Sequence, residues 1–328
     1  MNTKKLVRVG ASTALVFTLH GCAQPGAGNA TSGTTTISAS ADATIAPDVV
    51  SVASLTSGAT DARYDDATAI HVSLSDAGTT ADGAGVEASG STVTISEAGC
   101  YVLSGSLNGQ VLVNAPSDAD VTIVLADASV SCASSAALRV KSARSVTVIL
   151  AAGTENALST TGSFDDGNVD AALFVKAPLT ICGTGTLTVV STDIGITSRD
   201  TILLAGGTLT IEAGQHTLWA DDGIAVTGGS YVLNAGHDGM HVENDERQGA
   251  NVYLSGGTLT MTCAGDGIDA YGSVQVDDVT LSIDAQDQGI EATEDLLLRD
   301  GQISIRCVNE PLVVGGTQTV AEGVVRVS

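Results

Sequence analysis

The stretch that decides the fold runs from residue 185 to residue 305, where one strand-like phrase recurs. In order it reads Thr186-Leu-Thr-Val, Thr208-Leu-Thr-Ile, Ser230-Tyr-Val-Leu, Thr258-Leu-Thr-Met, Thr280-Leu-Ser-Ile and Gln302-Ile-Ser-Ile. The first residues of these phrases lie 22, 22, 28, 22 and 22 positions apart, and the longer interval contains a polar insertion over residues 244–249. A second apolar set keeps the same spacing: Ile196, Leu218, Met240, Ile268 and Ile290. Two sets in one register indicate a repeat architecture.

A repeat of about 22 residues, with about three short strands separated by Gly or Asp, predicts an all-β protein. The expected fold is a right-handed parallel β-helix (solenoid) with coils of about 22 residues. In such a fold equivalent residues of successive coils lie above one another, so the second apolar set would form one interior column. Leucine-rich repeats need a fixed Leu and Asn spacing that is absent here, and propeller blades need about 40 residues.

Composition agrees with many short strands, because the chain has 38 glycines and only 3% aromatic residues. Its 13 basic residues face 37 acidic ones, a formal net charge of −24. Residues 1–22 hold three basic residues and no acid, so the chain without them has 10 basic and 37 acidic residues, a charge of −27. This charge argues against nucleic acid as a partner. It favours cations, or ligands that cations carry.

The N-terminus predicts export. A basic start is followed by an apolar run over residues 9–19 and then by Leu19-His20-Gly21-Cys22, the pattern of a signal peptide with a lipobox-like end. We expect Cys22 to become the lipidated first residue of a cell membrane lipoprotein that faces the exterior; plain cleavage and release is the alternative. Residues 23–62, rich in Ser, Thr and Ala, are predicted to be a flexible tether. Residues 63–328 are predicted to be the β-helix domain, which we expect to be a monomer.

Five cysteines follow Cys22, an odd number, so at least one thiol is free or pairs outside the chain, and the protein does not look stabilised by disulfides. Cys263 and Cys307 occupy equivalent positions two repeats apart. Stacked strands are spaced about 4.8 Å apart, so the two Cα atoms would be roughly 9–10 Å apart. A disulfide requires a shorter Cα–Cα distance.

Acidic residues fall into outward-facing columns of the expected stack, in two groups. One group is Asp238, Asp266, Asp269 and Glu291, and the other is Asp200, Asp221, Asp222, Glu243 and Asn244. Two carboxylates about 4.8 Å apart repel by about 1 kcal/mol in water and by about 3–4 kcal/mol at an effective dielectric constant near 20. A bound cation reverses that sign, and oxygen ligands favour Ca²⁺.

The recurrence of Asp-Gly has another explanation, and the histidines add a further possibility. Asp-Gly could recur only because turns favour both residues. The histidines His71, His216, His237 and His241 look too scattered to form a metal site, although His241 could join a site at Asp238.

Several phrases resemble a known family. They are Asp238-Gly-Met-His, Asp266-Gly-Ile-Asp-Ala, Gln288-Gly-Ile-Glu-Ala, the Gly-Gly-Thr-Leu-Thr strands and Gly99-Cys-Tyr-Val-Leu-Ser-Gly-Ser-Leu. Together they resemble a bacterial family of calcium-binding parallel β-helix carbohydrate-binding domains, related in fold to pectate-type polysaccharide lyases. The resemblance covers about residues 64–314.

The resemblance implies that the protein binds calcium and an acidic or cellulose-like plant polysaccharide, without established lyase activity. Asp238 and Asp266 match the family's Asp-Gly-Ile aspartates. Gln288 and the phrase His216-Thr217-Leu218 depart from that pattern, which puts the cation sites of those coils in question.

The leading functional prediction is calcium-dependent, non-catalytic binding of a polysaccharide at the cell surface, with Ca²⁺ bridging protein carboxylates to the uronates of a pectin-like chain. The candidate carbohydrate contacts are Trp219, His241, Arg199 and Tyr271, and no catalytic residue is predicted.

Two alternatives remain. One is a calcium-dependent polysaccharide lyase, which needs a base beside the metal; the basic residues available are Lys176, Arg199, Arg247, Arg299 and Arg306, of which Arg199 is best placed. The other is an adhesin or spacer stalk that binds no glycan.

Overall fold

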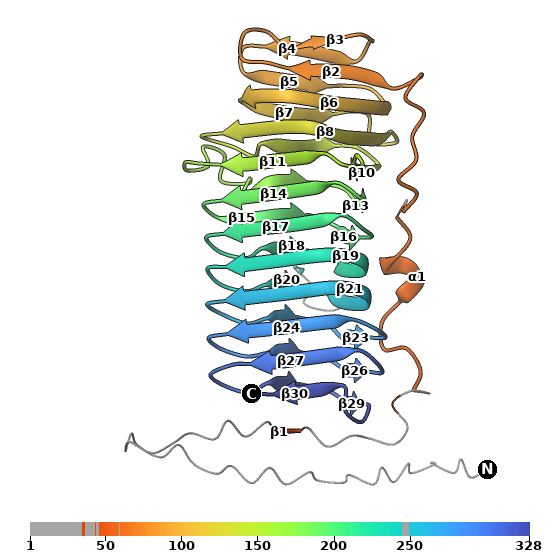
Figure 1. Ribbon diagram of the computed structural model, residues 1–328, viewed down its shortest axis with the longest axis vertical. Coiled ribbons are helices and arrows are strands. Elements are labelled where there is room, and N and C mark those ends of the chain that lie inside the picture. Colours follow the sequence, from red (N-terminus) through yellow and green to blue (C-terminus); the bar gives the residue numbers. More distant parts are fainter. Residues whose placement is uncertain (1–34, 37–42, 44–45, 59, 245–248) are drawn as a thin grey trace, which may run out of the picture. The chain divides into compact units, whose positions relative to one another are not determined.

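The structure is a computed structural model that describes residues 35–36, 43, 46–58, 60–244 and 249–328. The chain divides into residues 1–33 and 34–328, and the second unit contains every described residue. The predicted signal peptide, Cys22 and Arg247 lie outside the described residues. Strands dominate what is described, and α1 (Val52–Leu55) is a short helix (Figure 1). The prediction of an all-β protein is confirmed.

The larger of two sheets, sheet 1, has 19 strands within the described residues. They are β1 (Thr35–Thr36), β2 (Ile70–Leu74), β3 (Thr80–Ala81), β6 (Gly99–Asn108), β8 (Asp120–Cys132), β10 (Ser145–Leu150), β11 (Glu155–Thr160), β13 (Leu179–Gly183), β14 (Thr186–Ser191), β16 (Thr201–Leu204), β17 (Thr208–Ala213), β19 (Gly223–Ala235), β21 (Asn251–Cys263), β23 (Val274–Val276), β24 (Thr280–Ala285), β26 (Leu296–Leu298), β27 (Gln302–Arg306), β29 (Gln318–Val320) and β30 (Val325–Val327).

Sheet 2 has 11 strands within the described residues, and Trp219, His241, Asp269 and Glu291 lie on it. They are β4 (Val86–Ser89), β5 (Thr92–Ile95), β7 (Gln110–Asn114), β9 (Leu138–Ser142), β12 (Ala171–Val175), β15 (Ile194–Ser198), β18 (Leu218–Ala220), β20 (Met240–Val242), β22 (Ile268–Ala270), β25 (Ile290–Ala292) and β28 (Leu312–Val314).

Equivalent residues of successive repeats pair directly, as the spacing predicts. On sheet 2 the second apolar set forms one column, because each member is the parallel partner of the next. All of its members are fully buried: Ile196, Leu218, Met240, Ile268 and Ile290. On sheet 1 the recurring phrases pair in the same way, from Leu187 through Leu209 to Tyr231. The apolar core is therefore built from vertical columns of like residues between the sheets.

The predicted fold class, a right-handed parallel β-helix (solenoid) built from uniform coils, is corrected by the sheet topology. The strands form two sheets instead of the three strand faces expected for each coil. Two stretches expected to be separate strands are joined in β19 and again in β21, which are each 13 residues long and pair through a register shift after Val226. Spacing along the chain also varies, since Val146 pairs with Val121 on one side and with the more distant Leu179 on the other. Antiparallel pairs β1–β30, β2–β3 and β4–β5 break the parallel pattern. A uniform solenoid is therefore wrong as the description of residues 34–328.

The predicted tether is also wrong for part of its length. Within residues 23–62, the described segment 46–58 packs against sheet 1, where Val50 and Leu55 are buried beside Leu203, Ala225 and Tyr253. The side chain of Gln275 holds this segment, because its Oε1 accepts a hydrogen bond from the Val49 amide at 3.0 Å. Apolar side chains and satisfied backbone groups thus order a stretch whose composition looks like a linker.

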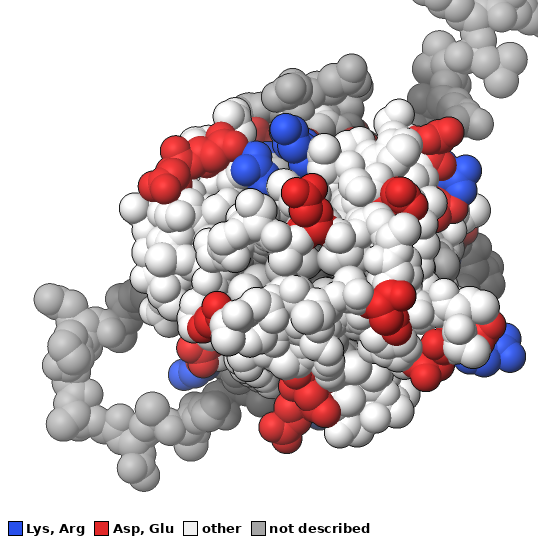
Figure 2. Space-filling view, turned by 90° about the horizontal axis from the view of Figure 1, so that it is seen from above, with Lys and Arg blue, Asp and Glu red and all other residues white. Residues whose placement is uncertain are grey.

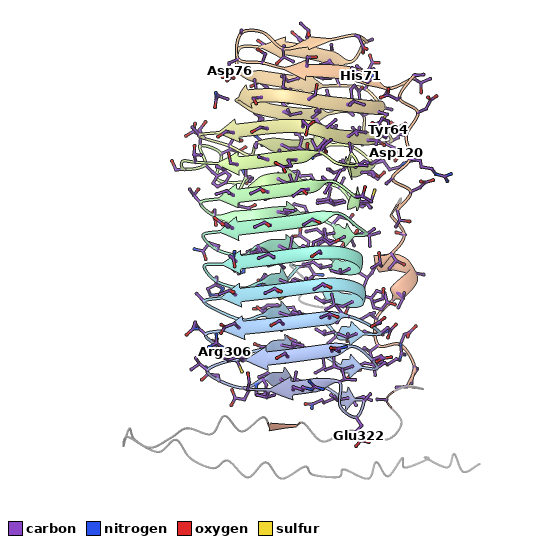
Figure 3. All side chains as sticks on the ribbon, viewed as in Figure 1. Tyr64, His71, Asp76, Asp120, Arg306 and Glu322 are labelled. Carbon is purple, nitrogen blue, oxygen red and sulfur yellow. The ribbon has the colours of Figure 1, made fainter. Side chains whose placement is uncertain are left out.

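The five cysteines after Cys22 are all free thiols, among them Cys263 and Cys307, whose spacing predicts that they do not pair. Within the described residues, no helix has the length and apolarity that a membrane crossing requires. Acidic side chains are distributed around the end of the molecule seen in Figure 2, and the few basic ones there lie beside acidic ones. Figure 3 places His71 and Asp76 near β2, and Arg306 at the opposite end near β27.

Candidate functional site

The outer face of sheet 2 carries a mixed column of polar and aromatic side chains. Residues at alternate positions of each short strand point inward, so the middle residue of β18, β20, β22 and β25 points outward. The strand register stacks five such residues in one column: Thr197, Trp219, His241, Asp269 and Glu291. Trp219 of this column lines a cleft, and His241 and Asp269 belong to a cluster of histidines.

The cleft has a volume of about 830 Å³. It is lined by residues that follow or belong to successive strands of sheet 2, together with the loop between β11 and β12: Gly167, Asn168, Lys176, Arg199, Trp219, Asp221, Glu243 and Asn244. Because the strands stack in register, turns that lie one repeat apart in the sequence contribute neighbouring walls. The cleft is thus a product of the repeat.

Arg199 is fixed at the cleft wall by two carboxylates. Its Nη2 lies 2.6 Å from Oδ2 of Asp170 and its Nη1 lies 3.4 Å from Oδ1 of Asp221. The guanidinium carbon also lies 5.6 Å from the centre of the Phe174 ring, a cation–π distance. Lys176 is exposed and makes no ion pair with any residue that the structure describes. The cleft therefore has one neutralised cation and one that can meet an anionic ligand.

Trp219 is half-buried between the cleft and the histidines. It packs against the apolar cluster that includes Val169 and Phe174. Its ring centre lies 5.1 Å from that of His216 and 4.7 Å from that of His241. The indole Nε1 is buried and has no hydrogen-bond partner within the described residues. The ring is therefore firmly held where it lines the cleft.

The second predicted acidic group divides between two hollows. Asp221, Glu243 and Asn244 line the cleft. Asp200 and Asp222, again with Asn244, line a second hollow of about 510 Å³ beside α1. The structure therefore brings three of the five predicted ligands together at the cleft and places the other two, Asp200 and Asp222, at the second hollow.

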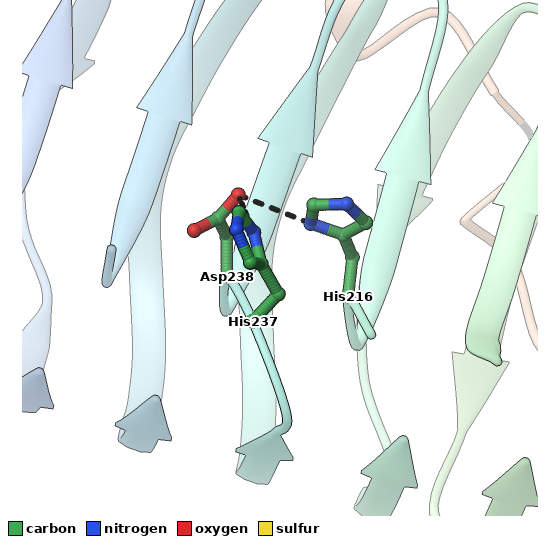
Figure 4. Close-up of side chains that lie close together, drawn as sticks. All are labelled: His216, His237 and Asp238. Atoms are coloured by element: carbon green, nitrogen blue, oxygen red, sulfur yellow. Dashed lines mark ion pairs between the residues drawn. The ribbon is translucent and has the colours of Figure 1, made fainter. Parts of the chain in front are cut away.

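The first predicted acidic group is centred on Asp238, which is only 2% exposed and is surrounded by imidazoles (Figure 4). Its Oδ2 lies 3.1 Å from Nδ1 of His216, 2.9 Å from Nδ1 of His237 and 3.4 Å from Nδ1 of His241. Nδ1 of His241 lies in turn 2.9 Å from Oδ2 of Asp269. We call these five residues, His216, His237, Asp238, His241 and Asp269, the histidine cluster.

The other oxygen of Asp238 has a structural task. Oδ1 accepts a hydrogen bond from the amide of Asp266 at 2.7 Å, and Oδ1 of Asp266 accepts one from the amide of Gln288, also at 2.7 Å. The glycine after each aspartate is required by close stacking, since a Cβ at Gly239 would lie 2.6 Å from the carbonyl oxygen of Gly267. The Asp-Gly phrases therefore tie one repeat to the next, rather than only forming turns.

The electrostatics of the cluster follow from burial and charge. Burial opposes ionisation of Asp238, but the imidazoles of His216 and His241 outweigh it and hold the pKa of Asp238 below its usual range. Burial likewise disfavours the charged form of His241, but the carboxylates of Asp238 and Asp269 outweigh it and raise the pKa of His241 to about 10. Burial, with the nearby charge of Asp238, raises the pKa of Asp266 to about 6.

Of the remaining predicted residues, Glu291 lies one repeat beyond Asp269 in the same column, and burial followed by the charge of Asp269 raises its pKa. The ring centre of Tyr271 lies 5.9 Å from that of His241. Among the predicted carbohydrate contacts, Trp219 and Arg199 line the cleft, whereas the described lining includes neither Tyr271 nor the buried His241.

The histidines look too scattered in the sequence to form a metal site, whereas the structure places His216, His237 and His241 around Asp238. His71 belongs to β2 and is not among them. His216 and Asp238 occupy the same column one repeat apart, and His241 follows Asp238 closely in the chain. The repeat therefore contained the signal for the cluster. Sequence reasoning also missed the roles of Gly167 and Asn168 at the cleft, because their loop lies outside the regular repeat.

The surroundings of Asp238 do not fit an all-oxygen calcium site. Ca²⁺ takes carboxylate, carbonyl and water oxygens. Within the described residues, two sets of three ligand atoms lie within 4.8 Å of one another, and both contain imidazole: His216, His237 and Asp238, and Asp238, His241 and Asp269. Asp221, Glu243 and Asn244 at the cleft offer oxygens and suit calcium better.

Comparison with known proteins identifies relatives of the chain. Residues 89–328 match the model of a family described as carbohydrate-binding domain-containing protein. A protein of Acetivibrio thermocellus with the same description is 36% identical over an alignment of 213 residues, and the match covers 62% of this chain and 74% of that protein.

A solved structure is similar as well. The polysaccharide lyase-like protein from C. thermocellum, studied as a gadolinium derivative, has a TM-score of 0.65 and 26% sequence identity, and the match covers 78% of this chain and 98% of that one. The family match extends over most of the chain, including the cleft and the histidine cluster. The chain therefore belongs to the family of carbohydrate-binding domain-containing proteins.

Proposed function

We propose that the chain binds a polysaccharide carrying uronate carboxylates, without cleaving it, in the cleft beside Trp219. The observation that carries this proposal is the cleft itself, where an aromatic ring, the exposed Lys176 and a group of oxygen ligands line one hollow of about 830 Å³. Membership of a carbohydrate-binding family supports it. The acidic substrate class and the absence of catalysis are the proposed parts.

Each wall of the cleft has a separate task in this proposal. The ring of Trp219 stacks on the apolar face of a sugar, since an aromatic side chain offers a large apolar surface. The ammonium of Lys176 meets a uronate carboxylate as a point charge. Arg199, held by Asp170 and Asp221, positions the wall rather than contributing a free charge.

Calcium has a bridging role in the proposal. A chain with 37 acidic and 13 basic residues repels an anionic glycan, so a cation between the two favours binding. Asp221, Glu243 and Asn244 would hold Ca²⁺ with oxygen ligands. The bound ion supplies positive charge for the uronate.

We further propose that the protein is exported and attached through Cys22 to the outer face of the cell membrane, where such glycans are accessible.

The experiment uses the single tryptophan of the chain as a reporter. Purified protein is titrated with polygalacturonate or with a soluble cellulose-type glucan, in Ca²⁺ and after chelation, while Trp219 fluorescence is followed. Saturable quenching by polygalacturonate that chelation abolishes is the expected result. Binding of the neutral glucan alone would contradict the acidic substrate class. No binding of any glycan would favour a spacer stalk.

Lyase activity is the second candidate, favoured by one observation. Lys176 is an exposed amine without an ion pair among the described residues, and it shares the cleft with the proposed calcium ligands. The other basic candidates that the structure describes are engaged: Arg199 pairs with Asp170 and Asp221, Arg299 with Asp48 and Asp277, and Arg306 with Asp284. Incubation with polygalacturonate and Ca²⁺, followed by ultraviolet absorbance of the unsaturated product, tests this candidate. An increase that Lys176→Met abolishes would establish it.

A further inference from the structure

We propose that His216, His237 and Asp238 bind a divalent transition metal ion of the Zn²⁺ type, at a site separate from the cleft and independent of glycan binding. Nothing in the family description assigns this site. At the repeat that begins with His216, histidine nitrogens replace some of the oxygen ligands that a calcium site would need.

The three ligand atoms already stand at coordination spacing. Nδ1 of His216 and Nδ1 of His237 lie 3.1 and 2.9 Å from Oδ2 of Asp238, and all three atoms fall within 4.8 Å of one another. Tetrahedral zinc with bonds of about 2.0–2.2 Å places adjacent ligand atoms about 3.3 Å apart. The observed contacts to Oδ2 are close to that value.

The carboxylate is oriented for this purpose. Oδ1 of Asp238 is occupied by the Asp266 amide at 2.7 Å, which directs Oδ2 toward the imidazoles. Outer hydrogen bonds of this kind fix the ligands of metal sites. A Cβ on Gly265 would lie 2.3 Å from Oδ1, so the glycine leaves room for the carboxylate.

Hydrogen bonding alone does not explain the imidazoles. The side chain of His216 is 11% exposed and that of His241 is 9% exposed, and Nδ1 of each is buried without a hydrogen bond of acceptable geometry among the described residues. Buried polar atoms are rarely left in this state. For His216, an ion held between its Nδ1 and Oδ2 of Asp238 would satisfy the buried atom, whereas Nδ1 of His241 lies closer to Asp269, at 2.9 Å, than to Asp238.

Donor chemistry decides which metal is expected. Imidazole suits Zn, Cu, Fe and Ni, whereas Ca²⁺ and Mg²⁺ prefer oxygen alone. Three protein ligands leave a fourth position, and the side chain of His237 is 58% exposed, so this position is open to water. His216 precedes β18, and His237 and Asp238 precede β20, so the ion would link two consecutive repeats.

The experiment titrates Zn²⁺ alone into the full chain after chelator treatment and removal of the chelator, by calorimetry and by thermal melting. The expected result is one saturable site and a higher melting temperature, with no competition from millimolar Ca²⁺. Co²⁺ in place of Zn²⁺ should give visible absorption bands of a nitrogen-ligated ion. Ligand-induced stabilisation follows because the folded state alone has the site.

His237→Asn is the test variant, because this side chain is exposed and its loss leaves the packing intact. Affinity for Zn²⁺ should fall at least tenfold. His71→Asn is the matched control, since His71 lies in β2 and also faces a carboxylate, with its Nε2 3.5 Å from Oδ1 of Asp66 (Figure 3). Its affinity should equal that of the unaltered chain.

Three outcomes would overturn the proposal. The first is the absence of saturable Zn²⁺ binding, which would leave only imidazolium–carboxylate pairs. The second is equal Zn²⁺ affinity in His237→Asn and the unaltered chain, which would exclude His237 as a ligand. The third is displacement of Zn²⁺ by Ca²⁺. Because glycan is absent throughout, failure here is distinguishable from failure of polysaccharide binding. Retention of Zn²⁺ in His237→Asn together with its loss in Asp269→Asn would assign the ion to the other set of ligands and would likewise refute this one.

Discussion

Asp238 accepts a hydrogen bond at 2.7 Å from the backbone amide of Asp266, a residue 28 positions later in the chain. The same side chain thereby fastens one repeat to the next and presents its second oxygen to three imidazoles. A residue of the core scaffold is thus also the centre of the histidine cluster. Structure and chemistry at this repeat are therefore linked through one carboxylate.

Replacement of Trp219 should weaken glycan binding without unfolding the protein. Trp219→Ala removes the aromatic platform, and we expect at least a tenfold loss of affinity for polygalacturonate, about 1.4 kcal/mol. Trp219→Phe keeps a ring and should retain most of the affinity. Calorimetric titration measures both, with melting temperatures as the check on folding. Equal affinity in all three proteins would remove Trp219 from the binding site.

Lys176 and Lys141 form a matched pair, because they follow equivalent residues, Val175 and Val140, of adjacent strands, and only Lys176 lines the cleft. Lys176→Met should reduce affinity for polygalacturonate severalfold and make it less sensitive to salt, since one charge contact is lost. Lys141→Met should bind as the unaltered chain does. Titrations at two ionic strengths distinguish them. An equal effect of both variants would indicate general charge attraction instead of a site.

Calcium should stabilise the chelator-treated protein against heat. At a Ca²⁺ concentration of 100 times Kd, binding to the native state alone adds about 2.7 kcal/mol. The Asp221→Asn, Glu243→Gln double variant should lose the calcium-dependent part of the melting temperature. Asp118→Asn, an exposed acid outside the cleft, should keep it. Melting curves that are identical with and without Ca²⁺ would contradict the proposed calcium site.

The interior column should be sensitive to truncation. Ile268 is fully buried between Met240 and Ile290, and Ile268→Ala should lower the free energy of unfolding by about 2–5 kcal/mol through the cavity it leaves. Val308→Ala is the control, since Val308 is 67% exposed and should change stability by less than about 0.5 kcal/mol. Urea unfolding followed by circular dichroism measures both. Similar losses would mean that the column is not the core.

Gln275 should determine whether segment 46–58 stays in place. Its side chain is fully buried, accepts from the Val49 amide and donates to Asp48 and Asp277. Gln275→Leu removes these bonds, so the segment should be cleaved faster by protease, with the cuts confined to it. Gln286→Leu, at an exposed position, serves as the control. Mass spectrometry of timed digests locates the cuts, and unchanged rates would show that Gln275 does not hold the segment.

The repeat made much of the site predictable. Its fixed interval assigned Asp269 and Glu291 to one group of stacked acids, and the strand register pairs them directly. It also predicted that Asp238 and Asp266 are neighbours, as their hydrogen bond shows. The uniform coil failed even within the regular stretch, because long strands such as β21 continue through register shifts that strand periodicity does not reveal.

The sequence by itself determined which residues stack, because side chains alternate along a strand and equal spacing keeps them in register. Only the tertiary structure decided which neighbouring columns converge. The imidazoles of His216, His237 and His241 come from adjacent positions whose side-chain directions depend on how the chain turns before β18 and β20. The same holds for Asp170, which reaches Arg199 from an irregular loop. The repeat period therefore determines which residues are partners on neighbouring strands. The packing of the turns determines which side chains from different turns and strands come into contact.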